Sequence, residues 1–263
     1  MFMQSDAVEV KVVGAAGTIV LNRPDYGNAM TRSMLEQFGE ALDDLYRERR
    51  VRAIVLTGGG DSFCEGADLI EVQASGETPE AYAQWGQDAE LWRETIVRML
   101  EVTKPVIAAV NGPALGHGAA LVAAADMAVA ASTATFGLPD VRRGLVAGLA
   151  GPLLCFRLGA GQAARLLLAS QTIDAAEAHR IGVFHEVVAA DKAWARAMEW
   201  VDQCAAGAPQ AIQLTKRLLN ETMAEQLLTQ LTSGSALAAT AHTTPAAEEG
   251  IAAFLDGREP NWP

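Results

Sequence analysis

The stretch from Lys104 to Asp126, KPVIAAVNGPALGHGAALVAAAD, constrains the fold more than any other part of the sequence. Apolar residues predict a strand over Pro105–Val110, and Gly116-His117-Gly118 opens a helix with almost no polar side chain. A helix that is apolar on every side must be buried. Glycines at its start let a second backbone or a ligand approach the free N–H groups of the first turn. These groups carry partial positive charge, so the turn is suited to hold an oxygen that becomes negative during a reaction.

Composition narrows the classes of function. The chain has 263 residues, half of them hydrophobic, which is enough to bury one large core. Its net charge of −12 argues against nucleic-acid binding, which needs a basic surface to neutralise phosphates. Cys64, Cys155 and Cys204 are far apart and odd in number, so we expect no disulfide framework, no metal site and a reducing cytoplasmic location.

Targeting signals are not evident in the sequence. The first ten residues, MFMQSDAVEV, lack the cationic and apolar regions of a secretory signal. No apolar run reaches the roughly 20 residues of a membrane span. We therefore expect no association with a membrane.

The order of elements predicts an α/β fold followed by a helical tail. A hairpin (8–13 and 18–21) precedes a helix that Thr31 caps, and a buried strand follows at 51–57. Aromatic and apolar residues recur at helical spacing over 82–102, which predicts a helix. We interpret them as core packing and not as an aromatic ligand-binding site. Further elements are predicted as strands at 127–131 and 185–188 and helices at 163–168, 175–180, 193–206, 209–223, 225–241 and 246–254.

Two glycine-bearing turns each follow a buried strand, at Phe63–Asp68 and at Gly112–Gly118. If the two strands lie side by side, backbone N–H groups of both turns can converge on one oxygen. The glycines do not match a dinucleotide fingerprint or a P-loop, and the chain has no G-x-S-x-G elbow. From the residues alone the convergence is a hypothesis, because most turns after strands only reverse the chain.

Ordered motifs along the chain resemble the enoyl-CoA hydratase/isomerase (crotonase) superfamily. The resemblance implies a crotonase-like spiral of ββα repeats in residues 1–192 and a helical trimerisation region in residues 193–263. It also implies a homotrimer or a dimer of trimers. The segments that carry it are Gly17–Pro24 (GTIVLNRP), Arg52–Gly58 (RAIVLTG), Phe63–Asp68 (FCEGAD), Lys104–Gly118, Phe136–Gly144 (FGLPDVRRG) and Leu166–Val188.

The resemblance further implies an acyl-CoA thioester as substrate, with no separate cofactor because coenzyme A is part of that substrate. In such enzymes two backbone N–H groups form an oxyanion hole for the thioester carbonyl, and they map to Ala67 and His117. Each well-placed donor of this kind lowers a barrier by roughly 3–4 kcal/mol. The neighbouring residues expected to bind substrate are Gly66, Asp68, Leu69 and Gly116.

Three positions depart from the pattern of the superfamily. His117 stands where relatives carry glycine, Ala120 where hydratases carry a first glutamate, and Asp140 where they carry a second. Hydration needs one group to activate water and another to manage the α-proton. Since Ala120 can do neither, we predict single-acid proton transfer of the enoyl-CoA isomerase type, with Asp140 as the catalytic residue.

Other interpretations stay open at this point. Asp140 follows a proline and is also placed to cap a helix near Arg142. His117 either acts as a base or donor, since imidazole titrates near neutrality, or fills the space of the missing glutamate. The alternatives to isomerisation are therefore a hydrolase, lyase or atypical hydratase that uses His117, or an acyl-CoA-binding protein without catalysis.

Overall fold

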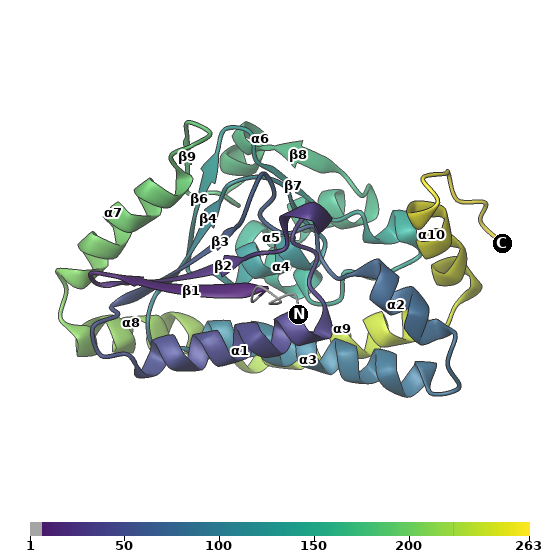
Figure 1. The fold of residues 1–263 in the computed structure, drawn as a ribbon, viewed down its shortest axis with the longest axis horizontal. Coiled ribbons are helices and arrows are strands. Elements are labelled where there is room, and N and C mark those ends of the chain that lie inside the picture. Colours follow the sequence, from purple (N-terminus) through teal and green to yellow (C-terminus); the bar gives the residue numbers. More distant parts are fainter. Residues whose placement is uncertain (1–6, 223) are drawn as a thin grey trace, which may run out of the picture.

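A six-stranded sheet forms the centre of the computed structural model, which describes residues 7–222 and 224–263 (Figure 1). β1 and β2 form the predicted antiparallel hairpin, and the other neighbours are parallel. Every residue of β3 and β4 is buried, as expected for parallel strands covered on both faces. In sheet order the strands are β1 (Val8–Val13), β2 (Ala16–Leu21), β3 (Ala53–Gly58), β4 (Val106–Val110), β6 (Met127–Ala131) and β9 (Glu186–Val188).

A second, three-stranded sheet holds β5 (Ala114–Leu115), β7 (Thr135–Gly137) and β8 (Thr172–Asp174). The chain passes from β4 through β5 into α4 (His117–Ala124). It passes again from β6 through β7 into the 3-10 helix η2 (Asp140–Arg143) and α5 (Ala150–Leu168). Strand, short strand and helix thus repeat, as the predicted crotonase-like α/β fold requires.

Most of the remaining helices lie where the sequence predicted them, whereas η1 (Pro24–Tyr26) and α2 (Leu69–Gly76) were not predicted. Thr31 caps α1 (Arg32–Arg47), accepting a hydrogen bond from the Met34 N–H at 3.2 Å. The expected helix at 209–223 ends at Glu221, and its last predicted residue, Met223, lies outside the described residues, as do Met1–Asp6 of the stretch without a secretory signal. The helices are η1 (Pro24–Tyr26), α1 (Arg32–Arg47), α2 (Leu69–Gly76), α3 (Ala81–Glu101), α6 (Ala175–Arg180), α7 (Ala193–Ala205), α8 (Pro209–Glu221), α9 (Ala224–Ala241) and α10 (Pro245–Leu255).

Helices cover both faces of the large sheet. On one face α7 packs Ala197 and Val201 against Val55, Ile107 and Val129 of the sheet. The other face carries the larger core, to which α1, α3, α4 and α5 contribute, together with Leu227 and Leu231 of α9. α7, which starts at Ala193, is the first helix of the predicted helical region. Apolar residues of α7 and α9 pack into the same cores as the sheet.

A buried lysine anchors α8 to the core. Lys216 is 5% exposed, and its Nζ lies 2.8 Å from Asp126 Oδ2. It also donates to the carbonyls of Met99 and Lys104, each at 3.1 Å. Burial lowers the pKa of Lys216, and the Asp126 carboxylate opposes that shift.

Replacement of Lys216 by methionine is expected to lower the free energy of unfolding by about 3 kcal/mol, because it leaves the partly buried Asp126 carboxylate without its cationic partner. Urea denaturation measures this effect. Lys192→Met is the control, since the pair of Lys192 with Asp191 is exposed and such pairs contribute less than about 1 kcal/mol. Equal losses in the two variants would contradict the anchoring role of Lys216.

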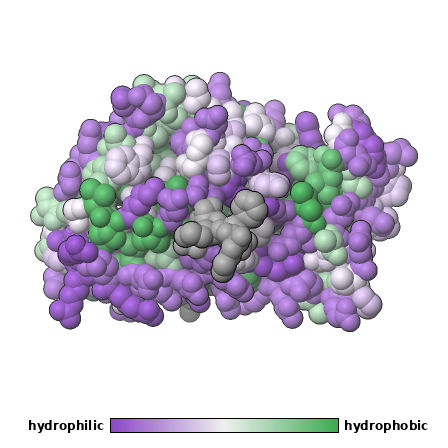
Figure 2. Space-filling model, viewed as in Figure 1, coloured by the Kyte–Doolittle hydropathy of each residue, from purple (hydrophilic) through white to green (hydrophobic). Residues whose placement is uncertain are grey.

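Some apolar side chains remain at the surface. Figure 2 shows them gathered over β1, where Val10, Val12 and Val13 are exposed on an edge strand. Charged Lys11 and Glu9, which pair at 2.9 Å, lie on the same strand, as is common at sheet edges. Along the described part of the chain, no helix combines the length and the apolar character that crossing a membrane requires.

Candidate active site

The two glycine-bearing turns lie against each other, because the strands that precede them, β3 and β4, are parallel neighbours. The N–H groups of Phe63 and Cys64 donate to the Pro113 carbonyl, and the Leu115 N–H donates to the Cys64 carbonyl at 2.9 Å. A Cβ atom added at Gly118 would lie 2.0 Å from Cys64 O. Only glycine allows this approach of the two backbones.

The N–H group of Ala67 faces away from its neighbouring segment. Residue 30 bridges to this turn, with Met30 N–H donating to Gly66 O at 2.8 Å and Asp68 N–H donating to Met30 O at 3.0 Å. In a parallel bridge of this pattern, the N–H of the central residue points to the opposite side. Among the described residues it has no acceptor, and Ala67 lines a pocket there.

The N–H group of His117 is the second free donor beside this pocket. His117 is the first residue of α4, so its N–H has no acceptor within the helix. The preceding Gly116 N–H donates to Gly137 O, and no described residue accepts from His117 N–H. A Cβ added at Gly66 would lie 3.3 Å from His117 N, so the two turns are in contact at this point. Two adjacent backbone donors can stabilise one developing oxyanion.

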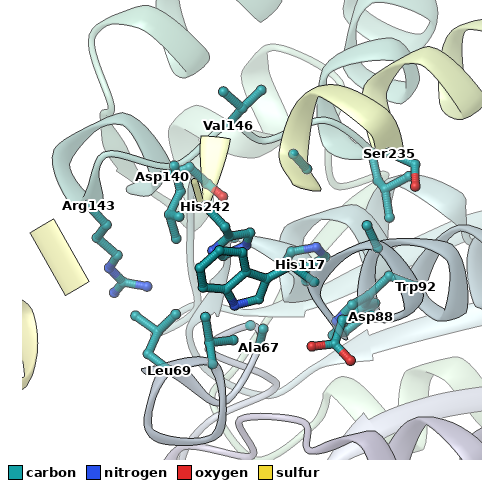
Figure 3. A pocket seen from close by; sticks show the side chains of 18 of the residues that line it. Ala67, Leu69, Asp88, Trp92, His117, Asp140, Arg143, Val146, Ser235 and His242 are labelled. Atoms are coloured by element: carbon teal, nitrogen blue, oxygen red, sulfur yellow. The ribbon is translucent and has the colours of Figure 1, made fainter. Parts of the chain in front are cut away.

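The pocket brings together most of the residues that the sequence predicted (Figure 3). Gly66, Ala67, Leu69, Gly116, His117 and Asp140 all line it. Asp68 does not. Its Oδ1 caps α2 by accepting from the N–H groups of Ile70 and Glu71, and its Oδ2 lies 2.5 Å from Arg23 Nη1. Asp68, which the resemblance placed among the substrate-binding residues, thus lies outside the lining of the pocket, and its carboxylate caps a helix.

Asp140 places a buried carboxylate beside the oxyanion turn. The residue is 7% exposed, and its Oδ2 is buried without a hydrogen-bond partner among the described residues. A Cβ added at Gly116 would lie 3.9 Å from both of its carboxylate oxygens. Burial raises the pKa of Asp140, and nearby Arg143 opposes the shift. A raised pKa makes this carboxylate a stronger base than an exposed aspartate.

Comparison with known proteins gives the family to which the chain belongs. The model of the enoyl-CoA hydratase/isomerase family matches residues 13–263. The chain belongs to this family. A short-chain-enoyl-CoA hydratase of Clostridium acetobutylicum is 32% identical over 98% of this chain and 97% of its own length. A 2,3-dehydroadipyl-CoA hydratase of Escherichia coli is 31% identical over 93% of each chain.

Solved structures of the enoyl-CoA hydratase/isomerase family have the same fold. The crystal structure of a member from Xanthobacter autotrophicus Py2 has a TM-score of 0.89 and 27% identity, covering 97% of this chain and 95% of its own. The carnitinyl-CoA hydratase of Mycobacterium avium has a TM-score of 0.83 and 31% identity, covering 98% of this chain and 99% of its own. The crotonase-like fold predicted from the motifs is confirmed.

Ala120 stands where the hydratases of the family carry their first glutamate, and it lies inside α4. Ala120 is 1% exposed and is not among the residues that line the pocket. Its methyl group cannot exchange a proton.

Within residues 7–222 and 224–263, no three His, Cys, Asp or Glu side chains are grouped to hold a metal ion.

The imidazole of His117 lies in the pocket and packs on Trp92, with ring centroids 4.3 Å apart. Burial and, to a smaller extent, nearby His242 lower its pKa to about 4. The ring is therefore neutral above about pH 5.

We expect His117→Gly to keep turnover within about tenfold, since the variant retains the backbone N–H and loses only a wall of the pocket. Steady-state kinetics between pH 5.5 and 9 are the measurement, and the wild type should show no inflection from His117 in that range. A loss of more than a hundredfold would instead give the imidazole a part in proton transfer.

Several residues that line the pocket were not predicted. Trp85 and Trp92 belong to the periodic segment interpreted as core packing; Trp92 is buried, but both residues line the pocket. His242 follows α9 and stacks on Trp85 with ring centroids 5.6 Å apart. The signal available in the sequence was the pair Trp85 and Trp92, which lie two turns apart on α3.

Proposed function

We propose that the protein moves a carbon–carbon double bond of an enoyl-CoA thioester, with Asp140 as the single acid and base. The observation that carries this proposal is the buried, unpartnered carboxylate beside two free backbone donors. The other two carboxylates of the pocket have partners. Asp88 makes two hydrogen bonds with Arg32, at 2.6 and 2.7 Å, and Glu65 accepts one from Ser62 Oγ at 3.1 Å.

In this mechanism the thioester carbonyl oxygen accepts hydrogen bonds from Ala67 N–H and His117 N–H, which form the oxyanion hole. Asp140 removes a proton from C2 of a 3-enoyl-CoA, and the electron pair moves onto the carbonyl oxygen as a dienolate. The carboxylic acid then returns the proton to C4, leaving a 2-enoyl-CoA. Aspartate is shorter than glutamate by about 1.5 Å, so the reacting carbons must lie close to Gly116. No cofactor is needed beyond the coenzyme A of the substrate.

A second candidate function is atypical hydration of a 2-enoyl-CoA, with His117 in place of the missing glutamate. The presence of the His117 ring in the same pocket as Asp140 favours it, and the relatives named above are hydratases. A neutral imidazole with a depressed pKa is a weak base, which makes this the less favoured alternative.

A panel of thioesters separates these functions. The purified protein is supplied with 3-enoyl-CoA and 2-enoyl-CoA, and the products are separated by liquid chromatography. Formation of 2-enoyl-CoA from the 3-enoyl isomer supports isomerisation. Hydration of the 2-enoyl substrate without isomerisation supports the alternative. Binding without turnover of either compound would show an acyl-CoA-binding protein and overturn both.

We also propose that the protein acts in the cytoplasm as a homotrimer or a dimer of trimers. Exposed Leu214, Leu218 and Leu219 on α8 support self-association through the helical region, since large apolar groups gathered on a surface often mark an interface. The cysteines Cys64, Cys155 and Cys204 are all free, which suits a reducing compartment. Analytical ultracentrifugation tests the assembly, and a monomer at micromolar concentration would contradict it.

A further inference from the structure

Polar atoms without partners are concentrated around the pocket. Within the described residues, four buried side-chain nitrogen or oxygen atoms have no hydrogen-bond partner, and three of them belong to pocket residues: Trp85 Nε1, His242 Nδ1 and Asp140 Oδ2. Buried polar groups almost always have partners, so each exception requires an explanation. Proton transfer accounts for Asp140, but it leaves Trp85 and His242 unexplained.

Trp85 and His242 form part of the wall of the pocket. Their rings are stacked, with centroids 5.6 Å apart and planes at 24°. Both residues also line a second cavity, between α2, α3 and α10, which Ala67, His117 and Asp140 do not reach. The stacked pair therefore lies between the pocket and this cavity. A substrate held by its thioester at Ala67 and His117 contacts the pair if its acyl chain extends along this wall of the pocket.

Charges near the pair select a neutral partner. Burial lowers the pKa of His242, which favours the neutral ring, and His117 beside it is neutral as well. Asp88 is the nearby carboxylate, and it is paired with Arg32. Arg143, which could attract a carboxylate, lies on the Asp140 side of the pocket, opposite Asp88 (Figure 3). A carboxylate on the acyl chain would thus meet no free cation at the stacked pair.

We propose that the stacked pair Trp85 and His242 binds a neutral hydroxyl or carbonyl oxygen on the acyl chain of the substrate, beyond the carbons that react. This inference rests on the proposed function, because it takes the pocket to hold an acyl-CoA. The Trp85 Nε1–H can only donate, whereas His242 Nδ1 can donate or accept according to its tautomer. A hydroxyl oxygen that accepts from Trp85 and donates to His242 satisfies both. A pocket built to bond an oxygen rejects chains that lack it, because its polar groups are then left unpaired.

Saturated thioesters test this subsite without turnover. We would measure dissociation constants of hexanoyl-CoA and of its 4-, 5- and 6-hydroxy and 5-oxo derivatives by isothermal titration calorimetry. At least one oxygenated chain should bind about tenfold more tightly than hexanoyl-CoA. Trp85→Phe keeps an aromatic ring but loses the N–H, and the preference should fall to about twofold or less. Trp194→Phe is the matched control, because the Trp194 N–H bonds Thr18 Oγ1 outside the pocket, and it should keep the full preference.

Three results would overturn the inference while leaving the proposed function intact. These are equal binding of hexanoyl-CoA and all oxygenated chains, tightest binding of adipoyl-CoA through its carboxylate, and a preference unchanged in both Trp85→Phe and His242→Phe. Equal binding would mean that the two nitrogens take no part in binding the acyl chain. Failure of the wild type to bind any acyl-CoA would overturn the proposed function as well, so the two failures are distinct.

Discussion

Asp140→Asn is expected to lower kcat/KM for isomerisation of a 3-enoyl-CoA by about 10³-fold, because the amide keeps the shape of the side chain but cannot exchange the proton. Binding of a saturated acyl-CoA should be unchanged. Asp191→Asn is the control, since this exposed carboxylate pairs with Lys192 away from the pocket. Turnover of Asp140→Asn within tenfold of the wild type would remove Asp140 from the mechanism.

The same substitution should stabilise the fold near neutral pH. Burial raises the pKa of Asp140, so the folded protein holds this proton more tightly than the unfolded chain does. Stability therefore falls as pH rises from the ordinary pKa of an aspartate, about 3.9, through the raised folded value, and it stays lower above that value. Asparagine does not titrate, so the variant does not lose stability in this way as pH rises.

Denaturant unfolding at several pH values checks this linkage. The advantage of Asp140→Asn should grow with pH and then level off, and the acid limb of kcat/KM in the wild type should lie in the same pH window. A wild type more stable than the variant at pH 8 would show that the contacts of the carboxylate outweigh its burial.

Gly66→Ala is expected to lower kcat by about 10²-fold or more, which is the loss seen when one oxyanion donor is misplaced. Gly66 has a φ of +108°, a conformation that residues with a Cβ rarely adopt. The added methyl group would lie 3.2 Å from Leu115 O and 3.3 Å from His117 N, so it pushes the two turns apart. The measurement is single-turnover kinetics at saturating substrate.

Gly14→Ala is the matched control for that substitution. Gly14 also has a positive φ, +59°, but a Cβ added there meets no atom within 4 Å. Both variants carry backbone strain, so both should unfold at lower denaturant concentration. Only Gly66→Ala should lose turnover. If the two variants lost activity in parallel, the effect would be general destabilisation and not displacement of the donors.

The long elements of the fold were predictable because each carries its own periodic pattern. The expected helix at 175–180 and strand at 127–131 match α6 and β6, whereas β5, β7 and β8 were not predicted. These strands have two or three residues each and are defined by pairing with one another, which no local pattern records. The first part of α5 was also missed. The non-helical Gly159, with φ +76°, interrupts it.

The residues of the candidate site also divide into those that local motifs predicted and those that only tertiary packing brings together. The turns at Ala67 and His117 and the carboxylate of Asp140 lie in compact motifs, so the sequence predicted them. Trp85 and His242 come from α3 and from the end of α9, and tertiary packing alone brings them together. Asp68 was placed in the site because it stands in a matched motif, but its carboxylate caps a helix.

Both donors of the candidate oxyanion hole belong to the main chain, and this makes the site tolerant of sequence drift. A side-chain change at residue 117 leaves its N–H in place, so histidine there is compatible with the same geometry as glycine. The flanking glycines are different: Gly116 has a φ of +52°, and Gly118 has no room for a Cβ. Alanine scanning would therefore overlook the donors themselves, whereas replacing the amide bond at residue 67 or 117 by an ester would delete each one. Searches for similar sites should weigh the spacing of the glycines above the identity of the residue between them.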